Sequence, residues 1–189
     1  MSPAAGAVDQ DGAVLVVVIG GPIASGKSAL GREVAARLEE RLEIGASVID
    51  LDLMYEMLDA RRLPKEDVEL WAQARRVAGR LAKVLLSENR AVVAEGDFAG
   101  DQALHEFERE LPKDADLRLV MLGVSVSTAL DRARADSTRG ISKDRAFLSS
   151  HYEAFSAEWR GRDVLRLDTG SMALSETVQT VVEWLRRPR

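Results

Sequence analysis

The 189-residue sequence predicts a three-layer α/β/α fold, in which helices cover both faces of a five-stranded parallel sheet. Short, mainly apolar runs of strand length alternate with longer amphipathic segments, and no internal repeat is visible. The runs are Val14–Ile19, Ala46–Ile49, Ala91–Ala94, Leu117–Leu122 and Val164–Leu167. The first run leads into a glycine-rich loop that a helical pattern follows. This alternation of strands and helices is typical of a parallel sheet with both faces covered.

The loop after the first run fits the P-loop pattern of a glycine, four residues and Gly-Lys-Ser, since it reads Gly21-Pro22-Ile23-Ala24-Ser25-Gly26-Lys27-Ser28. Backbone N–H groups of such a loop and of the following helix bind phosphate. We expect Lys27 to reach the β- and γ-phosphates of ATP or GTP and Ser28 to bind Mg²⁺. The other expected nucleotide contacts are Gly21, Ala24, Ser25, Gly26 and Ala29. A plain turn with a surface lysine is the alternative, but the flanking strand and helix favour a nucleotide site.

Helical spacing predicts three helices between the first and third strands. The buried positions of the first, over residues 27–43, recur every four residues: Leu30, Val34, Leu38 and Leu42. A short helix over 53–60 ends before Pro64, and a longer one runs from about Glu66 to Ser87. The expected buried stripe of the longer helix is Val68, Trp71, Ala74, Ala78, Leu81 and Leu85.

Four helices are predicted in the second half of the chain, over about 102–110, 125–136, 143–159 and 171–187. The second of them begins with a serine-rich cap at Ser125–Ser127. Pro112 closes the first of these, and Trp184 is expected in the core. A polar segment, Asp136–Ser142, interrupts the pattern.

Composition excludes several classes of protein. Hydrophobic residues make up 46%, a globular value, and the apolar runs are far shorter than a membrane span. There is no cysteine, two histidines are too few for a typical zinc site, and a net charge of −5 argues against a broad nucleic-acid-binding surface. We expect a disordered tail over 1–12 that is not a signal peptide, one domain over 13–189, and a cytoplasmic protein.

Acidic residues follow two of the predicted strands. Asp50 and Asp52 come after the second strand, and Glu95 and Asp97 come after the third. The carboxyl ends of parallel strands open onto the ligand crevice of such sheets. One carboxylate of the first pair is expected to serve hydrated Mg²⁺ and the other to accept a proton from a substrate hydroxyl. Asp52 has the alternative role of capping a helix that begins at Leu53, and the role of Asp97 stays open between Mg²⁺, a substrate hydroxyl or amine, and a turn.

The P-loop, the Asp50-Leu51-Asp52 motif and the arginine-rich fourth helix together resemble the small-molecule P-loop kinases, such as shikimate kinase, gluconate kinase and chloramphenicol phosphotransferase. The resemblance extends from about Val14 to Leu185. It implies that Asp50 belongs to the metal shell and that Asp52 is the catalytic base or a substrate anchor.

Arginines near the end of the fourth helix extend the resemblance. It implies that Arg132 stacks on adenine and that Arg139, in a lid over about 136–146, reaches the transferring phosphate. A solvated basic helix end is the alternative. The chain departs from shikimate kinase where Glu95-Gly96-Asp97 replaces a triple glycine, and arginines for a substrate carboxylate are placed only loosely, at Arg61, Arg75 or Arg76.

The resemblance implies that the acceptor pocket is built from the helices that lie between the second and third strands in the sequence. Tyr55, Trp71 and Phe98 are candidates for an apolar wall, with core packing as the alternative, and Arg75 and Asp97 are candidates for polar contacts. No role is assigned to His105 or His151.

These patterns predict an ATP- and Mg²⁺-dependent phosphotransferase that acts on a hydroxyl of a small molecule, either a metabolite or an antibiotic. Lys27, Asp52 and Arg139 are the expected catalytic residues. One alternative is a polynucleotide or nucleoside 5′-hydroxyl kinase, although no nucleic-acid or membrane partner is expected. A second alternative is a regulatory module that binds ATP without transferring its phosphate.

Overall fold

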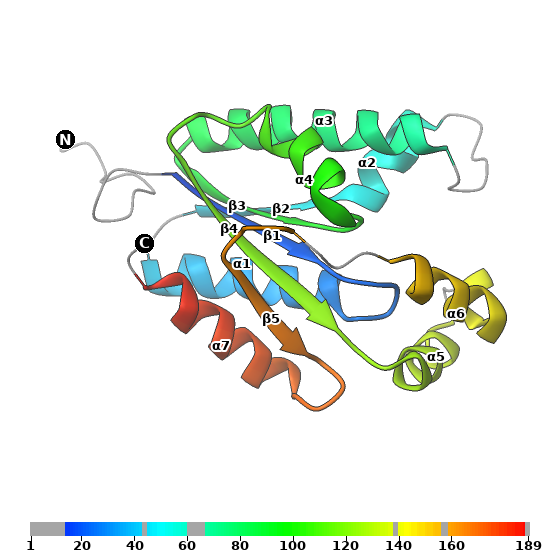
Figure 1. Cartoon of the computed structure of the whole chain (residues 1–189). Helices are drawn as coiled ribbons and strands as arrows, with labels where there is room; N and C mark the ends of the chain where they lie inside the picture. The colour runs from blue at the N-terminus through cyan, green and yellow to red at the C-terminus, as the bar shows by residue number, and fades with distance from the viewer. Residues whose placement is uncertain (1–13, 43–44, 60–66, 138–139, 156–158, 188–189) are drawn as a thin grey trace, which may run out of the picture.

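The computed structural model describes residues 14–42, 45–59, 67–137, 140–155 and 159–187 and forms the expected three layers (Figure 1). The strands are β1 (Val14–Gly20), β2 (Gly45–Asp50), β3 (Arg90–Glu95), β4 (Ala115–Gly123) and β5 (Val164–Asp168). All neighbouring strands pair in parallel, in the order β2-β3-β1-β4-β5. The predicted five-stranded parallel sheet is therefore confirmed. The expected tail over 1–12 lies outside the described residues.

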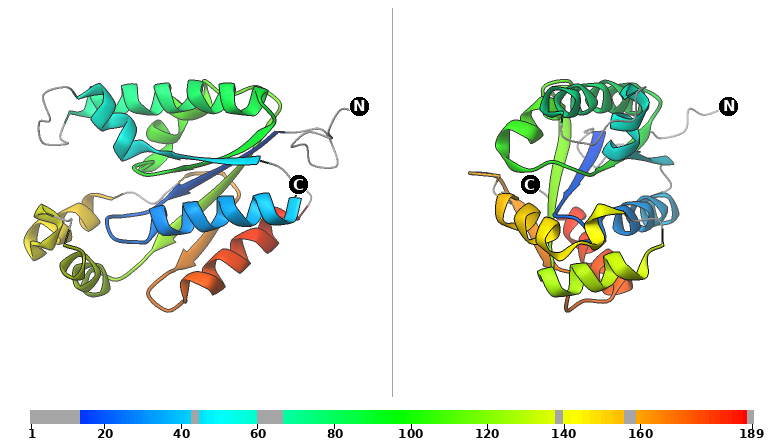
Figure 2. Two further views of the ribbon diagram at one scale, coloured as in Figure 1. Left: turned by 180° about the vertical axis from the view of Figure 1, so that it is seen from behind. Right: turned by 90° about the vertical axis from the view of Figure 1, so that its right-hand side faces the viewer.

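The helices cover the two faces of the sheet and its carboxyl end. Their bounds are α1 (Lys27–Leu42), α2 (Leu51–Leu58), α3 (Val68–Ser87), α4 (Gly100–Glu108), α5 (Val126–Ala135), η1 (Ile141–Lys143), α6 (Arg145–Ala154) and α7 (Leu174–Leu185). Figures 1 and 2 show α1 and α7 on one face, α2, α3 and α4 on the other, and α5 and α6 beyond the carboxyl ends of the strands. In the described part of the chain, no helix is long and apolar enough to cross a membrane.

The central strand β1 supplies both cores because its side chains alternate between the two faces of the sheet. Val17 and Ile19 pack in the core with α1 and α7, whereas Val16 and Val18 pack in the core with α3 and α4. All four side chains have no exposed surface. This explains why β1 is a continuous apolar run and not an alternating one.

Register fixes which residues meet at the carboxyl edge. Ile19, one residue before the end of β1, pairs with Glu95 at the end of β3, and Glu95 in turn pairs with Asp50 at the end of β2. The P-loop follows β1 directly. The sheet thus brings two carboxylates from separate strands to the start of the P-loop.

The start of α2 and the buried stripe of α3 correct two expectations. α2 begins at Leu51, since Asp50, and not Asp52, is its N-cap: the Asp50 carboxylate accepts a hydrogen bond from the Asp52 N–H over 2.8 Å. In α3, Val68 is 80% exposed and Leu81 is 37% exposed. The buried stripe consists mainly of small residues because α3 lies close to α4: Ala72, Ala74, Ala78, Gly79, Ala82 and Leu86, with Arg75.

The single helix expected over 143–159 is also corrected. Among the described residues, a turn of 3₁₀ helix ends at Lys143 and α6 begins separately at Arg145. Asp144 separates the two, because its carboxylate accepts the Phe147 N–H over 2.8 Å and so caps α6.

Candidate active site

The P-loop has the backbone that phosphate binding needs. Gly26 has a φ of +96°, and Ala24, which is not glycine, has a φ of +61°. α1 begins at Lys27, so the N–H groups of Lys27, Ser28 and Ala29 belong to its first turn, where they lack partners inside the helix. That turn contains no acidic residue, so the helix terminus keeps its positive partial charge. The loop therefore fits a polyphosphate.

Lys27 folds back over the loop. Its ammonium group donates hydrogen bonds to the carbonyl oxygens of Gly21, over 2.8 Å, and Pro22, over 3.0 Å. Both acceptors are neutral backbone groups, so the charge of Lys27 stays close to the space where the phosphates of a nucleotide would lie. This position agrees with the expected role of Lys27.

Glu95 is the acid at the centre of the site. Its side chain lies at the end of β3 and is 2% exposed. Burial, and next the neighbouring charge of Asp50, raise the pKa of Glu95 to about 7, although a hydrogen bond from Ser28 and the charge of Lys27 act in the opposite direction. The sequence left this residue without a role. The sequence did show that Glu95 follows an apolar run, but only the strand order shows that this run lies next to β1.

The oxygen atoms around Ser28 fit a magnesium ion bound together with a nucleotide. The Ser28 hydroxyl contacts Glu95, and the charges of Asp50 and Asp52 both act on Glu95, so these groups share one corner of the crevice. Hydroxyl and carboxylate oxygens suit Mg²⁺, which usually keeps waters and phosphate oxygens as its remaining ligands. No group of three or more acidic or histidine side chains in the described ranges forms a metal cage by itself.

Asp52 occupies the first turn of α2, beside the N-cap Asp50. Its side chain is exposed toward solvent, in contrast to Glu95. An exposed carboxylate at this edge is accessible to an acceptor molecule, which agrees with the expected role of base. The cap is Asp50, so the alternative reading of Asp52 as the cap is wrong.

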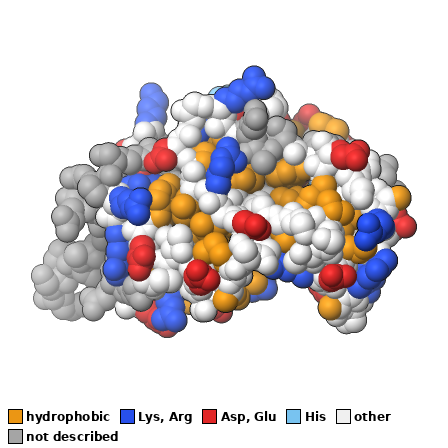
Figure 3. All heavy atoms as spheres, turned by 60° about the horizontal axis from the view of Figure 1, so that its bottom comes forward, with side chains coloured by type: hydrophobic (Ala, Val, Ile, Leu, Met, Phe, Trp, Pro, Cys, Tyr) orange, Lys and Arg blue, Asp and Glu red, His pale blue; other side chains and the backbone are white. Residues whose placement is uncertain are grey.

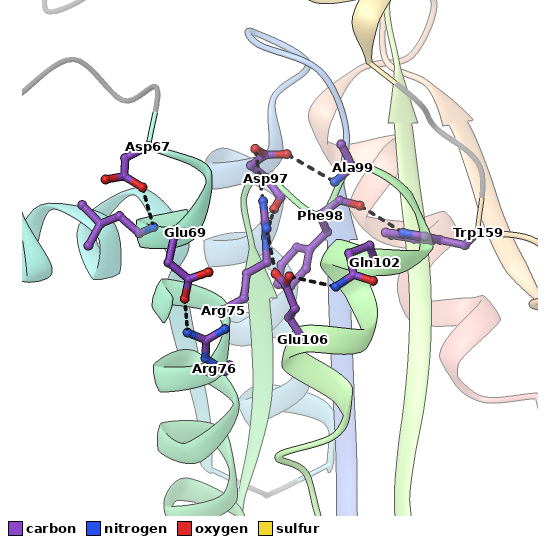
Figure 4. Close-up of polar contacts among 11 residues, drawn as sticks. Asp67, Glu69, Arg75, Arg76, Asp97, Phe98, Ala99, Gln102, Glu106 and Trp159 are labelled. Carbon is purple, nitrogen blue, oxygen red and sulfur yellow. Dashed lines mark hydrogen bonds and ion pairs between the residues drawn. The ribbon is translucent and has the colours of Figure 1, made fainter. Parts of the chain in front are cut away.

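Arg75, a candidate for acceptor binding, forms ion pairs with Asp97 and with the mostly buried Glu106 (Figure 4). The guanidinium of Arg75, whose residue is 8% exposed, donates to Glu106 over 2.9 Å and to the backbone carbonyl of Asp97 over 2.9 Å. Its Nη2 atom lies 3.4 Å from the Asp97 carboxylate, which also accepts the Ala99 N–H over 3.2 Å. Arg75 thus fixes the loop after β3 and has its charge balanced by protein carboxylates. A direct contact between Arg75 and an acceptor stays a prediction.

The aromatic candidates divide between core and surface. Phe98 has no exposed surface and Tyr55 is 1% exposed, so both pack in the core, the alternative that the sequence left open. Trp71 is partly buried, with its ring 4.5 Å from that of Tyr55 and 5.9 Å from the Arg75 guanidinium carbon. Tyr55 is too buried to contact an acceptor in this arrangement, whereas Trp71 keeps some exposed surface, and its contact with an acceptor stays a prediction.

Helix α6 reaches the P-loop, which sequence reasoning missed. His151 accepts the Ile23 N–H at its Nε2 atom over 3.4 Å, and the Tyr152 hydroxyl donates to the Ile23 carbonyl over 2.8 Å. Burial lowers the pKa of His151, the charge of Asp97 raises it and that of Lys27 lowers it. His151 therefore lies close enough to Asp97 and to Lys27 for both charges to affect it. In the expected lid, Arg139 lies outside the described residues.

Arg132 connects the P-loop with the loop that follows β5. Its guanidinium donates hydrogen bonds to the carbonyl oxygens of Ala24 and Thr169 and to the Thr169 hydroxyl. The stacking of Arg132 on adenine stays a prediction.

The chain shares its fold with solved small-molecule kinases. A sugar kinase from Janibacter sp. HTCC2649 superposes with a TM-score of 0.68 and 16% identity, over 92% of this chain and 94% of the other. APS kinase CysC from Mycobacterium tuberculosis, in complex with AMPPNP and APS, superposes with a TM-score of 0.71 and 20% identity, over 93% of this chain and 99% of the other. A gluconokinase from Sinorhizobium meliloti 1021 gives 0.61 and 18% identity over 91% and 97%.

No protein-family model and no curated protein matches the sequence. At these low identities, the similarity to solved structures establishes a P-loop kinase fold. It does not establish a substrate.

Proposed function

We propose that this protein transfers the γ-phosphate of ATP to a hydroxyl group of a small molecule. One observation carries the proposal: the sheet register brings Asp50 and Glu95 to the start of a P-loop whose lysine is already folded over it. The kinase fold, shared with structures of a sugar kinase and an APS kinase, supports the same conclusion. A protein that only binds a nucleotide would not need a further, exposed carboxylate such as Asp52 beside the phosphates.

The residues divide the work of phosphoryl transfer. The loop N–H groups and Lys27 hold the phosphates, and Ser28, Asp50 and Glu95 would hold Mg²⁺. The metal neutralises charge on the phosphate oxygens when it is bound. The acceptor oxygen attacks the γ-phosphorus, the bond to the β–γ bridging oxygen breaks, ADP leaves, and Asp52 takes the hydroxyl proton. Arg139 is proposed to approach the γ-phosphate from the lid.

The charges on the acceptor side favour a neutral or positively charged acceptor over an acid. Among the arginines considered for a substrate carboxylate, Arg75 is paired with two protein carboxylates and Arg76 with Glu69 over 2.7 Å, while Arg61 lies outside the described residues. The side chain of Asp97 keeps 39% of its surface exposed. We therefore expect turnover to fall in the order hydroxylated amine, neutral polyol, hydroxy acid.

The alternatives are less well supported. Basic and acidic side chains are interspersed on the described part of the face in Figure 3, whereas a polynucleotide would favour a continuous basic stripe. A polynucleotide kinase would show acceptor binding that weakens steeply with salt. A regulatory module would bind ATP but release no ADP with any acceptor.

Asp52→Asn and Lys27→Ala test the proposed chemistry. ADP formation is measured across the acceptor panel, and Mg·ATP binding is measured by calorimetry. Asp52→Asn should lose ~100-fold or more in turnover because a general base is removed, and should keep ATP affinity. Lys27→Ala should lose both turnover and ATP affinity. Asp114→Asn, an exposed and remote change of the same kind, is the control. Wild-type turnover in Asp52→Asn would refute the assignment of the base.

A further inference from the structure

We propose that Arg132 and Thr169 are positioning residues that hold the P-loop in its phosphate-binding shape, so that Arg132 serves ATP binding through the loop backbone. The proposal rests on the proposed function, since it assumes that the loop binds a polyphosphate. It assigns Thr169 a role that no sequence pattern indicated. It also gives Arg132 a role that is independent of the nucleobase.

The contacts form a chain from α5 through the β5–α7 loop to the P-loop. Arg132, in the last turn of α5, donates from Nη1 to the Ala24 carbonyl over 3.3 Å and to the Thr169 hydroxyl over 3.1 Å. Its Nη2 donates to the Thr169 carbonyl over 2.6 Å. The Thr169 hydroxyl in turn donates to the Ser25 carbonyl over 2.8 Å. Two consecutive P-loop carbonyls are therefore held from outside the loop.

Thr169 is itself firmly placed. It directly follows β5, is 8% exposed, and its N–H donates to the Gly123 carbonyl at the end of β4 over 2.9 Å. A buried hydroxyl attached to the sheet in this way loses little conformational freedom when it makes a further bond. The sheet thereby provides a fixed point for the loop.

The held carbonyls determine where the loop N–H groups point. In a planar trans peptide, the carbonyl and the N–H of the next residue point in opposite directions. The hydrogen bond from Thr169 to the Ser25 carbonyl therefore turns the Gly26 N–H away from Thr169, toward the inner side of the loop. On the other side of Gly26, its carbonyl accepts the Leu30 N–H over 3.0 Å, so the bond from Thr169 to Ser25 and the first turn of α1 act on the two peptides that flank Gly26.

The bond from Arg132 supports the strained residue next to it. Ala24 has a φ of +61°, a left-handed conformation that is strained for a residue with a Cβ. Such a conformation persists only where neighbouring contacts over-determine it. The guanidinium on the Ala24 carbonyl is one such contact, and the small apolar cluster of Ala24 with Ala129, Leu130 and Leu148 is another.

The two roles of Arg132 act on different parts of ATP, which allows them to be separated. Stacking would stabilise only a ligand with a base, whereas a shaped loop stabilises any polyphosphate. We propose to measure the Kd of ATP and of inorganic tripolyphosphate by calorimetry. The variants are Arg132→Met, Arg132→Lys, Thr169→Val and Thr169→Ser, each with thermal unfolding as a check on folding.

We expect Arg132→Met and Thr169→Val to weaken both ligands by a similar factor of about 10, the scale of one or two lost hydrogen bonds. Thr169→Ser keeps the hydroxyl and should bind like the wild type, and Arg132→Lys should be intermediate. Arg134→Met removes an exposed charge from the same helix and makes none of these contacts, so its effect should be less than about threefold.

Several results would overturn the inference. Arg132→Met that weakens ATP alone would place the guanidinium on the base. If Thr169→Val binds tripolyphosphate as tightly as the wild type does, the hydrogen bonds of Thr169 do not shape the loop and the inference is wrong. This measurement is informative even if Arg132→Met does not fold. A wild-type protein that binds neither ligand would refute the proposed function itself, which distinguishes the two failures.

Discussion

Replacement of Glu95 by glutamine tests whether the fold really holds an acid out of water at the carboxyl end of β3. The residue is 2% exposed, and its pKa is raised to about 7 from an ordinary value of 4.5. Below about pH 4.5, the carboxyl group is protonated in both the folded and the unfolded chain. As the pH rises toward and through 7, the unfolded chain ionises first and the folded chain must then bury a charge. Glu95 therefore makes the free energy of unfolding fall with rising pH.

The size of this effect follows from the two pKa values. Their difference corresponds to about 3 kcal/mol at full ionisation, of which ~2 kcal/mol is lost between pH 5 and pH 8. Glu95→Gln removes the titration but keeps a side chain that can accept the hydrogen bond from Ser28. We therefore expect the variant to resemble the wild type at pH 5 and to be more stable by ~2 kcal/mol at pH 8.

The assay is urea unfolding across this pH range in EDTA and without nucleotide, so that no bound cation alters the charge of Glu95. Glu88→Gln, an exposed change at the end of α3, is the control and should follow the wild type within ~0.5 kcal/mol at each pH. If Glu95→Gln differs from the wild type by the same amount at pH 5 and pH 8, the argument from burial is wrong. In the presence of Mg·ATP, the stabilised variant should nevertheless lose turnover.

Three further changes test the packing and the cap. Gly79→Ala should destabilise the protein by more than ~1 kcal/mol, because the added Cβ would lie 2.5 Å from the Phe107 carbonyl oxygen. Alanine favours helices, so a higher free energy of unfolding in urea would contradict this argument. Arg75→Met should cost ~3 kcal/mol, since it leaves the buried Glu106 carboxylate without its ion-pair partner, against less than ~1 kcal/mol for the surface change Arg76→Met. Asp50→Asn should keep the helix cap and thus the melting temperature within a few degrees, yet weaken Mg²⁺-dependent turnover; unchanged turnover would limit Asp50 to capping.

Local signals in the sequence were sufficient for the P-loop and the layers. The apolar run before Gly21 must be a buried strand, and Gly26 with Lys27 must turn the chain into a helix, because the conformations involved depend on neighbouring residues alone. The same holds for Ser125, whose side chain caps α5 as expected. The small buried face of α3 could not be read in this way, since it depends on how closely α4 approaches.

The sequence by itself thus determined the P-loop, the five strands and the carboxylates that follow them. Only the tertiary structure decided the environment of those carboxylates, because it comes from distant parts of the chain. Strand order brought Glu95 beside β1 and raised its pKa, and helix packing paired Arg75 with Asp97 and Glu106. The contact between Arg132 and Thr169 spans 37 residues of sequence and has no local pattern. Burial and long-range hydrogen bonds are properties of the folded chain, so residue types and spacing alone cannot predict them.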